Sequence, residues 1–197
     1  MTDTDVIDSK LREWTRGKGL REVIVAIFNR IRDIPYAVLP ELNSPRDYIH
    51  ILGLKMGSCT PKHFLLSKMY QRLGLDVLYV VCPYRWAEFK ELYPQGLWNL
   101  AEQMPIAHHL ACRVEINGRY VLVDATIDPP LGRIGLPVND SWDGISDTCL
   151  PVLPIGGEEI YHPSEAEFIS PPDLNENTLA FYRGLNDYFD RVRNGKV

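Results

Sequence analysis

The chain has 197 residues, 45% of them hydrophobic and 24% charged, so it can bury a core without disulfide or metal support. Its formal net charge of -5 and its lack of like-charge runs argue against a protein that binds nucleic acid or a membrane surface. The sequence has no apolar stretch of membrane-spanning length, and its start lacks the apolar centre of a signal peptide. We therefore expect a cytoplasmic protein. We also expect free thiols at its widely spaced cysteines, Cys59, Cys82, Cys112 and Cys149.

The N-terminal part is predicted to be helical after a loose start. Residues 1–8 carry no clear pattern, and a short helix is expected over 9–14. Apolar residues between 23 and 31 recur at helical spacing, which predicts an amphipathic helix that ends before Pro35. A Ser-Pro pair then favours another short helix over 46–52.

The next segment places a cysteine at the start of a helix. Cys59 stands between Ser58 and Thr60, both good N-cap types, and Pro61 suits the first helical turn. Apolar residues continue at helical spacing up to Gly74, a typical helix end. Because the N–H groups and dipole of a helix N-terminus stabilise a thiolate, Cys59 is a candidate nucleophile. The alternative is a small buried thiol at a strand–helix junction, which is the commoner role of a free cysteine.

A buried strand and an aromatic-rich segment follow that helix. Residues 76–82 are almost all apolar and include β-branched types, which predicts a strand buried on both faces that Pro83 stops. Residues 84–106 are rich in aromatic side chains, and a short helix is plausible over 86–92. This segment either forms a satellite core or lines a substrate site, and we favour the core.

The clearest predicted element is a β-hairpin. Asn117-Gly118 separates the apolar-rich runs 108–116 and 119–126, and this dipeptide is the strongest short signal for a type I′ turn. The turn fixes the pairing register, which gathers apolar residues on one face of the hairpin. His109 and Asp124 fall on the other face as diagonal neighbours, within reach of an imidazole–carboxylate hydrogen bond. Taken alone, the pair is equally well explained as a structural hydrogen bond at the end of a strand, with no role in catalysis.

Beyond the hairpin the sequence is rich in proline and loops. Short strands are predicted at 150–155 and 159–161 within the loop-rich stretch 127–172. Apolar residues at helical spacing then predict a C-terminal amphipathic helix, capped by Asn175 or Asn177, whose apolar side docks on the rest of the chain.

A cysteine at a helix N-terminus, a histidine and an aspartate, in that chain order, form a pattern of nucleophilic thiol catalysis. Asp124 would hold the imidazole of His109 in one tautomer, and His109 would take the Cys59 proton and later protonate the leaving group. The Cys59 N–H and a second donor that the sequence does not identify would form an oxyanion hole.

Three segments resemble motifs of the transglutaminase-like superfamily, whose fold is related to that of papain-like thiol proteases. Ile34-Pro35-Tyr36 at a helix end resembles its I-x-Y motif, and Gly57-Ser58-Cys59 resembles its G-x-C segment. Residues 109–126 resemble its H-A-W-V-E-V and V-D-P-T segments, with the hairpin spacing kept. The resemblance covers 20–126. The family's nucleophile, base and orienting acid then correspond to Cys59, His109 and Asp124.

The resemblance implies an α+β fold of the transglutaminase-like, papain-like type, with Cys59 on a central helix packed against an antiparallel sheet. It implies a cysteine enzyme, with a protease or amidase favoured, that cleaves or transfers an acyl group through a thioester. The expected partner is a peptide, protein or small amide substrate, and no metal or organic cofactor is required. We expect one domain over 1–197, with a core at 20–126 and a loop-rich extension at 127–197 that serves as a lid, a partner site or scaffold.

Three positions depart from the family pattern. Ala111 replaces an aromatic residue, Ala125 replaces a proline, and His63 stands where a small residue is usual. We expect His63 to be a surface residue. The alternative is that His63 lies next to Cys59 and tunes its thiol. These departures leave open the substrate and the choice between hydrolysis and transamidation, and they argue against protein crosslinking. The sequence does not predict an oligomeric state.

Two other functions remain as alternatives. A zinc site would draw on Cys82, His108, His109 and Cys112, but the sequence has no C-x-x-C, and the hairpin register sends His109 and Cys112 to opposite faces. A catalytically silent relative would keep the fold as a binding or interaction module. Retention of all three triad residue types argues against this second alternative.

Overall fold

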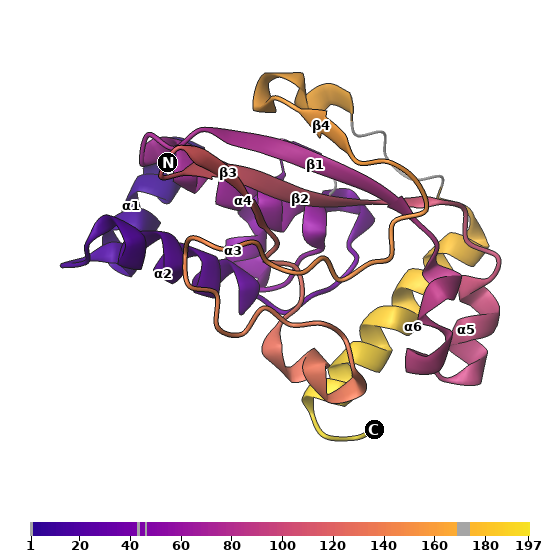
Figure 1. Ribbon diagram of the computed structural model, residues 1–197. Helices are drawn as coiled ribbons and strands as arrows, with labels where there is room; N and C mark the ends of the chain where they lie inside the picture. Colours follow the sequence, from indigo (N-terminus) through magenta and orange to yellow (C-terminus); the bar gives the residue numbers. More distant parts are fainter. Residues whose placement is uncertain (1, 43, 46, 169–173) are drawn as a thin grey trace.

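The computed structural model describes residues 2–42, 44–45, 47–168 and 174–197. Within them, helices pack against a four-stranded antiparallel sheet of order β3-β2-β1-β4, which confirms the predicted α+β class (Figure 1). The α-helices are α1 (Asp3–Thr15), α2 (Leu20–Arg32), α3 (Ile51–Leu54), α4 (Cys59–Arg72), α5 (Gln95–Ala101) and α6 (Glu176–Arg193). The strands are β1 (Val77–Tyr84), β2 (Ala107–Ile116), β3 (Arg119–Val123) and β4 (Glu159–Tyr161). Short 3-10 helices lie at Pro40–Leu42, Tyr48–His50, Trp86–Leu92, Pro129–Ile134 and Pro163–Phe168.

Helix α1 begins earlier than the sequence predicted. Thr2 and Asp5 form a capping box, in which the Thr2 hydroxyl accepts the Asp5 N–H at 3.2 Å and the Asp5 carboxylate accepts the Thr2 N–H at 2.8 Å. The expectation of a loose start over 1–8 is therefore wrong for 3–8, which are helical, while residue 1 lies outside the described residues. The short helix expected over 9–14 is the second half of α1. The apolar periodicity missed this start because the first turn carries mainly polar residues.

The next two predicted helices are found with altered detail. Helix α2 covers the stripe at 23–31 and ends before Pro35, as predicted. The helix expected over 46–52 is a 3-10 turn at Tyr48–His50 that continues into α3. Residue 46 itself lies outside the described residues.

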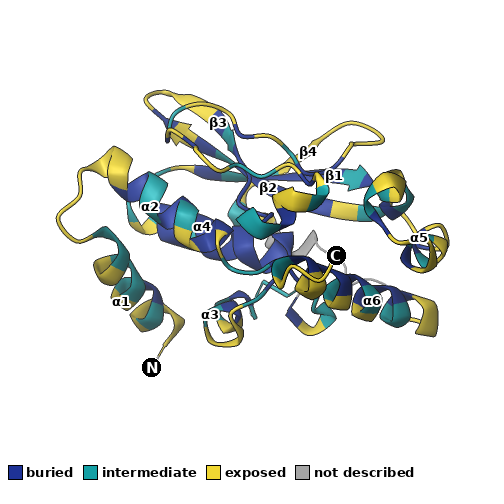
Figure 2. Ribbon diagram, turned by 90° about the horizontal axis from the view of Figure 1, so that it is seen from below, coloured by how far each residue is buried: buried dark blue, intermediate teal, exposed yellow. Residues whose placement is uncertain are grey.

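Helix α4 is the central helix, and both of its predicted ends are confirmed. At its C-terminus Gly74, with φ of 80°, forms a Schellman motif: Gly74 N–H donates to the Gln71 carbonyl at 3.0 Å and Leu75 N–H donates to the Tyr70 carbonyl at 3.2 Å. The helix is buried on every side from Cys59 through its second turn. Figure 2 shows this helix in dark blue between α2 and the sheet.

Strand β1 runs through Pro83, whereas the sequence predicted that Pro83 would stop it. The Pro83 carbonyl accepts the Ile155 N–H at 2.9 Å, so the hydrogen-bonding side of this residue faces away from β2. Pro83 therefore opposes His108 at a non-hydrogen-bonded position, where a missing N–H removes no ladder bond.

The hairpin of β2 and β3 has the predicted register. Ile116 pairs with Arg119 and Cys112 pairs with Val123. Asn117 has a φ of 54° and the following glycine one of 79°, the positive values that a type I′ turn requires. Strand β3 ends at Val123, short of the predicted run, and this early end shapes the site described below.

Two large apolar clusters hold most of the elements together. One lies between α1, α2, α4 and the sheet, and the other joins the aromatic segment after β1 to α5 and α6. In Figure 1, α5 and α6 lie side by side at one end of the molecule. The aromatic segment thus packs as a satellite core, as favoured, and part of it also lines the pocket described below. The expected helix at Trp86–Leu92 is in 3-10 form. Helix α5 was not predicted.

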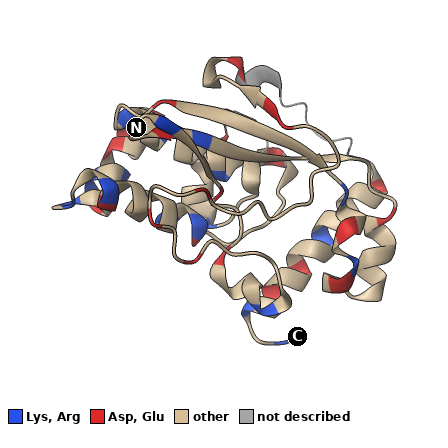
Figure 3. Ribbon diagram, viewed as in Figure 1, with Lys and Arg blue, Asp and Glu red and all other residues tan. Residues whose placement is uncertain are grey.

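The C-terminal part contains fewer regular elements than predicted. Residues 150–155 contain two prolines and form no strand, whereas β4 and α6 match their predictions. Asn175 caps α6, and the helix carries Glu176 in its first turn and two arginines in its last, which complement the helix dipole (Figure 3). No helix in the described part of the chain combines the length and apolar character that crossing a membrane requires.

Candidate active site

Cys59 is the first residue of α4, and a second chain segment fixes its approach. The Gly57 N–H donates to the Pro35 carbonyl at 3.0 Å, and the Ala37 N–H donates to the Gly57 carbonyl at 3.3 Å. A Cβ on Gly57 would stand 2.7 Å from Cγ2 of Ile51, closer than packed atoms tolerate. The glycine therefore lets the start of α4 pack tightly against the chain that follows α2.

His109 and Asp124 meet because the chain leaves β3 just before the aspartate. The His109 Nε2–H donates to Asp124 Oδ2 at 2.5 Å. Asp124 is itself held on three sides: its N–H donates to Thr148 Oγ1 at 2.8 Å, its Oδ1 accepts the Thr126 N–H at 2.9 Å, and its carbonyl accepts Asn139 Nδ2–H at 3.0 Å. The carboxylate is thus fixed toward one ring nitrogen of His109.

The Cys59 thiol lies at the part of β2 that β3 leaves unpaired. The sheet register turns the Leu110 N–H toward the β3 side, and β3 ends before reaching it. That N–H instead faces the Cys59 sulfur, and so does the His109 ring. Because Asp124 occupies Nε2, Nδ1 is the nitrogen of His109 available to the thiol. The structure therefore brings together all three residues that the sequence singled out.

The charges of these three groups support one another. Burial opposes ionisation of Cys59, but the His109 charge and the hydrogen bonds from His109 and Leu110 hold the thiol pKa below its ordinary value. Burial lowers the pKa of His109, but the charges of Asp124 and Cys59 outweigh it and raise that pKa to about 10. Burial raises the pKa of Asp124, while the neighbouring His109 more than offsets this, so the carboxyl pKa is lowered. The arrangement favours a thiolate–imidazolium pair beside a carboxylate.

Two further residues of α4 lie beside the triad. His63, expected at the surface, is 0% exposed, so that expectation is wrong. Lys62 is also fully buried, and its Nζ donates to the Arg32 carbonyl at 3.0 Å and the Thr126 carbonyl at 2.6 Å. Burial lowers the Lys62 pKa to about 7. Helical spacing places both residues one turn from Cys59, which is a signal for their proximity but not for their burial, whereas the loop residues that hold Asp124 carry no sequence signal.

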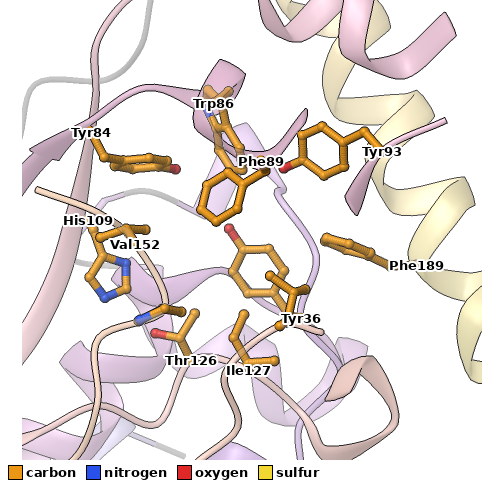
Figure 4. Close-up of a pocket in the computed structure, with 12 residues that line it drawn as sticks. Tyr36, Tyr84, Trp86, Phe89, Tyr93, His109, Thr126, Ile127, Val152 and Phe189 are labelled. Atoms are coloured by element: carbon orange, nitrogen blue, oxygen red, sulfur yellow. The ribbon is translucent and has the colours of Figure 1, made fainter. Parts of the chain in front are cut away.

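A small aromatic pocket adjoins His109 (Figure 4). Its free volume is about 20 Å³, room for about one water molecule. Cys59, His109 and Asp124 are only 8%, 2% and 1% exposed, so the site is closed in this conformation. The lining residues come from the segment after α2, the end of β1 with the aromatic segment, β2, the loops after β3, and α6. They are Tyr36, Tyr84, Trp86, Phe89, Tyr93, His109, Thr126, Ile127, Leu136, Pro151, Val152 and Phe189.

The pocket lining combines apolar walls with two unbonded polar groups. No Lys, Arg, Asp or Glu lines it in the described part of the chain. Trp86 Nε1 and Thr126 Oγ1 are buried and have no hydrogen-bond partner among the described residues. The pocket therefore favours an uncharged group that also carries hydrogen-bonding atoms.

The predicted zinc alternative does not fit this geometry. Among the described residues, no three His, Cys, Asp or Glu side chains are arranged to hold a metal ion. Cys112 Sγ lies 3.7 Å from the His63 carbonyl, whereas His109 is bonded to Asp124. The four cysteines are free thiols in the structure.

Comparison with known proteins gives little further information. No protein-family model matches the sequence, and no curated protein matches it. The chain is similar to the crystal structure of a putative cysteine protease from Cytophaga hutchinsonii, with a TM-score of 0.45 and 18% sequence identity. The match covers 66% of this chain and 39% of that chain, so this chain spans well under half the length of that protein.

Proposed function

We propose that this protein is a transglutaminase-like cysteine enzyme that cleaves an amide or peptide bond, or transfers its acyl group, through a thioester on Cys59. One observation carries the proposal: a thiol at a helix N-terminus, an imidazole and a carboxylate are in sequential contact and buried. The chain segments that carry the family resemblance also meet here, since the approach to Cys59 pairs with the chain around Tyr36.

In the first half-reaction the Cys59 thiolate attacks the carbonyl carbon of the substrate. The Cys59 N–H, in the first turn of α4 where helix N–H groups point outward, donates to the oxyanion that forms. The carbonyl–nitrogen bond then breaks, and Nδ1 of His109 gives its proton to the departing amine. The products are a free amine, a thioester on Cys59 and a neutral imidazole.

In the second half-reaction His109 acts as the base. It removes a proton from a water molecule or an amine that attacks the thioester carbonyl, and the carbon–sulfur bond breaks to return the thiolate. Water gives a carboxylic acid, and an amine gives a new amide. Asp124 keeps the ring in one tautomer and stabilises its positive charge in both halves.

The wall of the pocket favours an uncharged acyl donor. A charged group placed there would lose its hydration, and the one charged side chain that lines the pocket among the described residues, the His109 imidazolium, is already paired with Asp124, so this loss is costly. We therefore expect neutral or aromatic acyl groups to react better than anionic or cationic ones of similar size.

The test is the rate of alkylation of the native protein from pH 4 to pH 9, with mass spectrometry to identify the modified cysteine. Cys59 should react at a pH well below the ordinary thiol pKa of about 8.5. Cys149, the exposed cysteine, serves as the internal reference. His109→Ala should raise the pKa of Cys59. An acyl-donor panel with water and amines as acceptors then tests turnover, with Cys59→Ala as the inactive control.

A catalytically silent binding module is the second candidate, and the closed pocket favours it. The triad is almost inaccessible in this conformation, so a substrate must displace part of what surrounds it. If Cys59 titrates as an ordinary thiol whether or not His109 is present, the enzyme proposal is wrong and the binding module becomes the better explanation.

A further inference from the structure

His63 connects the element that carries Cys59 to the element that carries Asp124. Its Nδ1 lies 2.9 Å from the Cys59 carbonyl, one turn earlier on α4. Its Nε2 accepts the Ala125 N–H at 3.0 Å. Because the amide can only donate, Nε2 has no proton, and the ring proton therefore sits on Nδ1 and is donated to the Cys59 carbonyl. Both contacts fix a single neutral tautomer.

The two partners of His63 are next to the reacting groups in the chain. One is the carbonyl of Cys59 itself, and the other belongs to the residue that follows Asp124. A single rigid ring therefore sets the spacing between the start of α4 and the exit of β3. The His63 ring also stands edge-on to the His109 ring, with centroids 6.3 Å apart.

Lys62 adds a second link from the same helical turn. Its Nζ donates to the Thr126 carbonyl at 2.6 Å, one residue beyond the His63 contact. Strand β3 has already ended here, so no β-ladder holds this segment. The side chains of Lys62 and His63 therefore hold the backbone after β3 in place of β-sheet hydrogen bonds.

Burial of the polar His63 ring has a free-energy cost that its hydrogen bonds must offset. Position 63 is 0% exposed in the main core, where an apolar side chain would avoid the cost of removing polar atoms from water. The cost is offset only because both nitrogens are bonded, and both bonds end on backbone groups next to the triad.

We propose that His63 is a positioning residue, which holds Cys59 at the distance from the His109–Asp124 pair at which the thiolate forms. This inference rests on the proposed function and assigns a role to a residue outside the triad. The charged or titratable groups that face His63 are Asp124, His109 and Lys62. Burial lowers the pKa of His63 to about 4, so the bridge stays neutral over the working pH range.

The experiment compares His63→Leu, which removes both bonds, with His63→Gln, whose amide keeps one donor and one acceptor. Tyr70→Phe is the matched control, because it removes a buried hydrogen bond of α4, to the Ile24 carbonyl at 2.9 Å, far along the helix from Cys59. Each protein is assayed for its melting temperature, for the pH profile of Cys59 alkylation, and for kcat and KM on the acyl donor identified for the wild type.

His63→Leu should move the Cys59 pKa up toward the free-thiol value and lower kcat by on the order of a hundredfold, with KM nearly unchanged. His63→Gln should recover part of the lowered Cys59 pKa and part of the lost kcat. Tyr70→Phe should lose thermal stability while keeping the wild-type thiol profile and kcat.

A folded His63→Leu protein with the wild-type thiol profile and kcat overturns the inference. If that variant does not fold, His63→Asn, which is too short to reach both partners, is compared with His63→Gln, and equal thiol profiles overturn the inference as well. The proposed function is tested on the wild type alone, and an ordinary thiol pKa for wild-type Cys59 rejects the enzyme. A lowered Cys59 pKa that His63→Leu leaves unchanged rejects only the positioning role of His63.

Discussion

The carboxylate of Asp128 and the guanidinium of Arg193 form a two-point ion pair between residues 65 positions apart. Nε of Arg193 donates to Oδ2 and Nη2 donates to Oδ1, each at 2.8 Å. Both residues also bind the backbone of Tyr36: Asp128 Oδ1 accepts its N–H at 2.7 Å, and Arg193 Nη2 donates to its carbonyl at 2.7 Å. The end of α6 is thereby tied to a wall of the candidate pocket.

Replacement of Arg193 should therefore destabilise the protein strongly. Arg193→Met leaves the Asp128 carboxylate, 2% exposed, without its cation, and we expect a loss of about 3 kcal/mol in the free energy of unfolding. Urea unfolding measures it. Arg191→Met is the control, since Arg191 is exposed and only packs over the Tyr188 ring, and its expected loss is about 0.5 kcal/mol. Equal losses in the two variants would show that the ion pair does not anchor α6.

Gly57 should be intolerant of any side chain. Gly57→Ala places a Cβ 2.7 Å from the buried Ile51 side chain, which must move, and we expect a loss of about 1–3 kcal/mol. Gly53→Ala is the matched control, because a Cβ there meets nothing within 4 Å and alanine favours α3. Thermal unfolding of both variants checks this expectation, which is contradicted if Gly57→Ala melts at or above the temperature of Gly53→Ala.

The sequence predicted the parts of the fold that local patterns encode. Apolar periodicity and the Schellman glycine give α4, and Asn117-Gly118 gives the hairpin and its register, which brings His109 and Asp124 close together. Their contact also depends on the early end of β3 at Val123, which the sequence did not predict. The start of α1 was not predicted because its first turn is polar and its N-cap signal is one Thr–Asp capping box. The prediction that Pro83 stops β1 was wrong, because a proline ends a strand only where its missing N–H would have bonded to a neighbouring strand.

The parts that could not be predicted depend on contacts between distant segments. The early end of β3 is set by competition, since the Ala125 N–H bonds to His63 rather than to β2. The burial of His63 goes with that contact, and the burial of Lys62 goes with its own bonds to the Arg32 and Thr126 carbonyls. A helical pattern alone gives no reason to bury a charged side chain. The pocket likewise joins five separate segments, of which the aromatic one is the most conspicuous in the sequence.

The Asp124 carboxylate should set the alkaline limit of activity. Its charge raises the pKa of His109 against the opposing effect of burial, so Asp124→Asn should lower that pKa from about 10. The imidazolium then loses its proton at lower pH, and the alkaline side of the pH–rate profile should move down in pH. We expect kcat/KM to fall by on the order of a hundredfold or more, because the ring is no longer held in one tautomer.

The pH–rate profiles of wild type, Asp124→Asn and Asp187→Asn provide the measurement. Asp187 lies on the exposed side of α6, and its neutral variant should retain the wild-type profile. An unchanged alkaline limit in Asp124→Asn would mean that the carboxylate only fastens the strand end.

Lys62 should leave a signature in the pH dependence of stability. Its pKa is about 7 in the folded protein, because of burial, and about 10.4 in an unfolded chain. Between these values the unfolded state binds more protons, so the contribution of Lys62 to stability rises with pH. The free energy of unfolding of the wild type, relative to Lys62→Met, should therefore increase by about 2 kcal/mol from pH 7 to pH 9.

The comparison with Lys62→Met isolates this effect from the rest of the site. His109, with its raised pKa, contributes a fall in stability as pH rises through the same window, but it does so in both proteins and cancels in the difference. Lys68→Met, on the same helix, provides the control for loss of a lysine. A wild-type minus Lys62→Met difference that stays constant from pH 7 to pH 9 would show that Lys62 keeps an ordinary pKa, and that its charge is accommodated by the two carbonyl groups it binds.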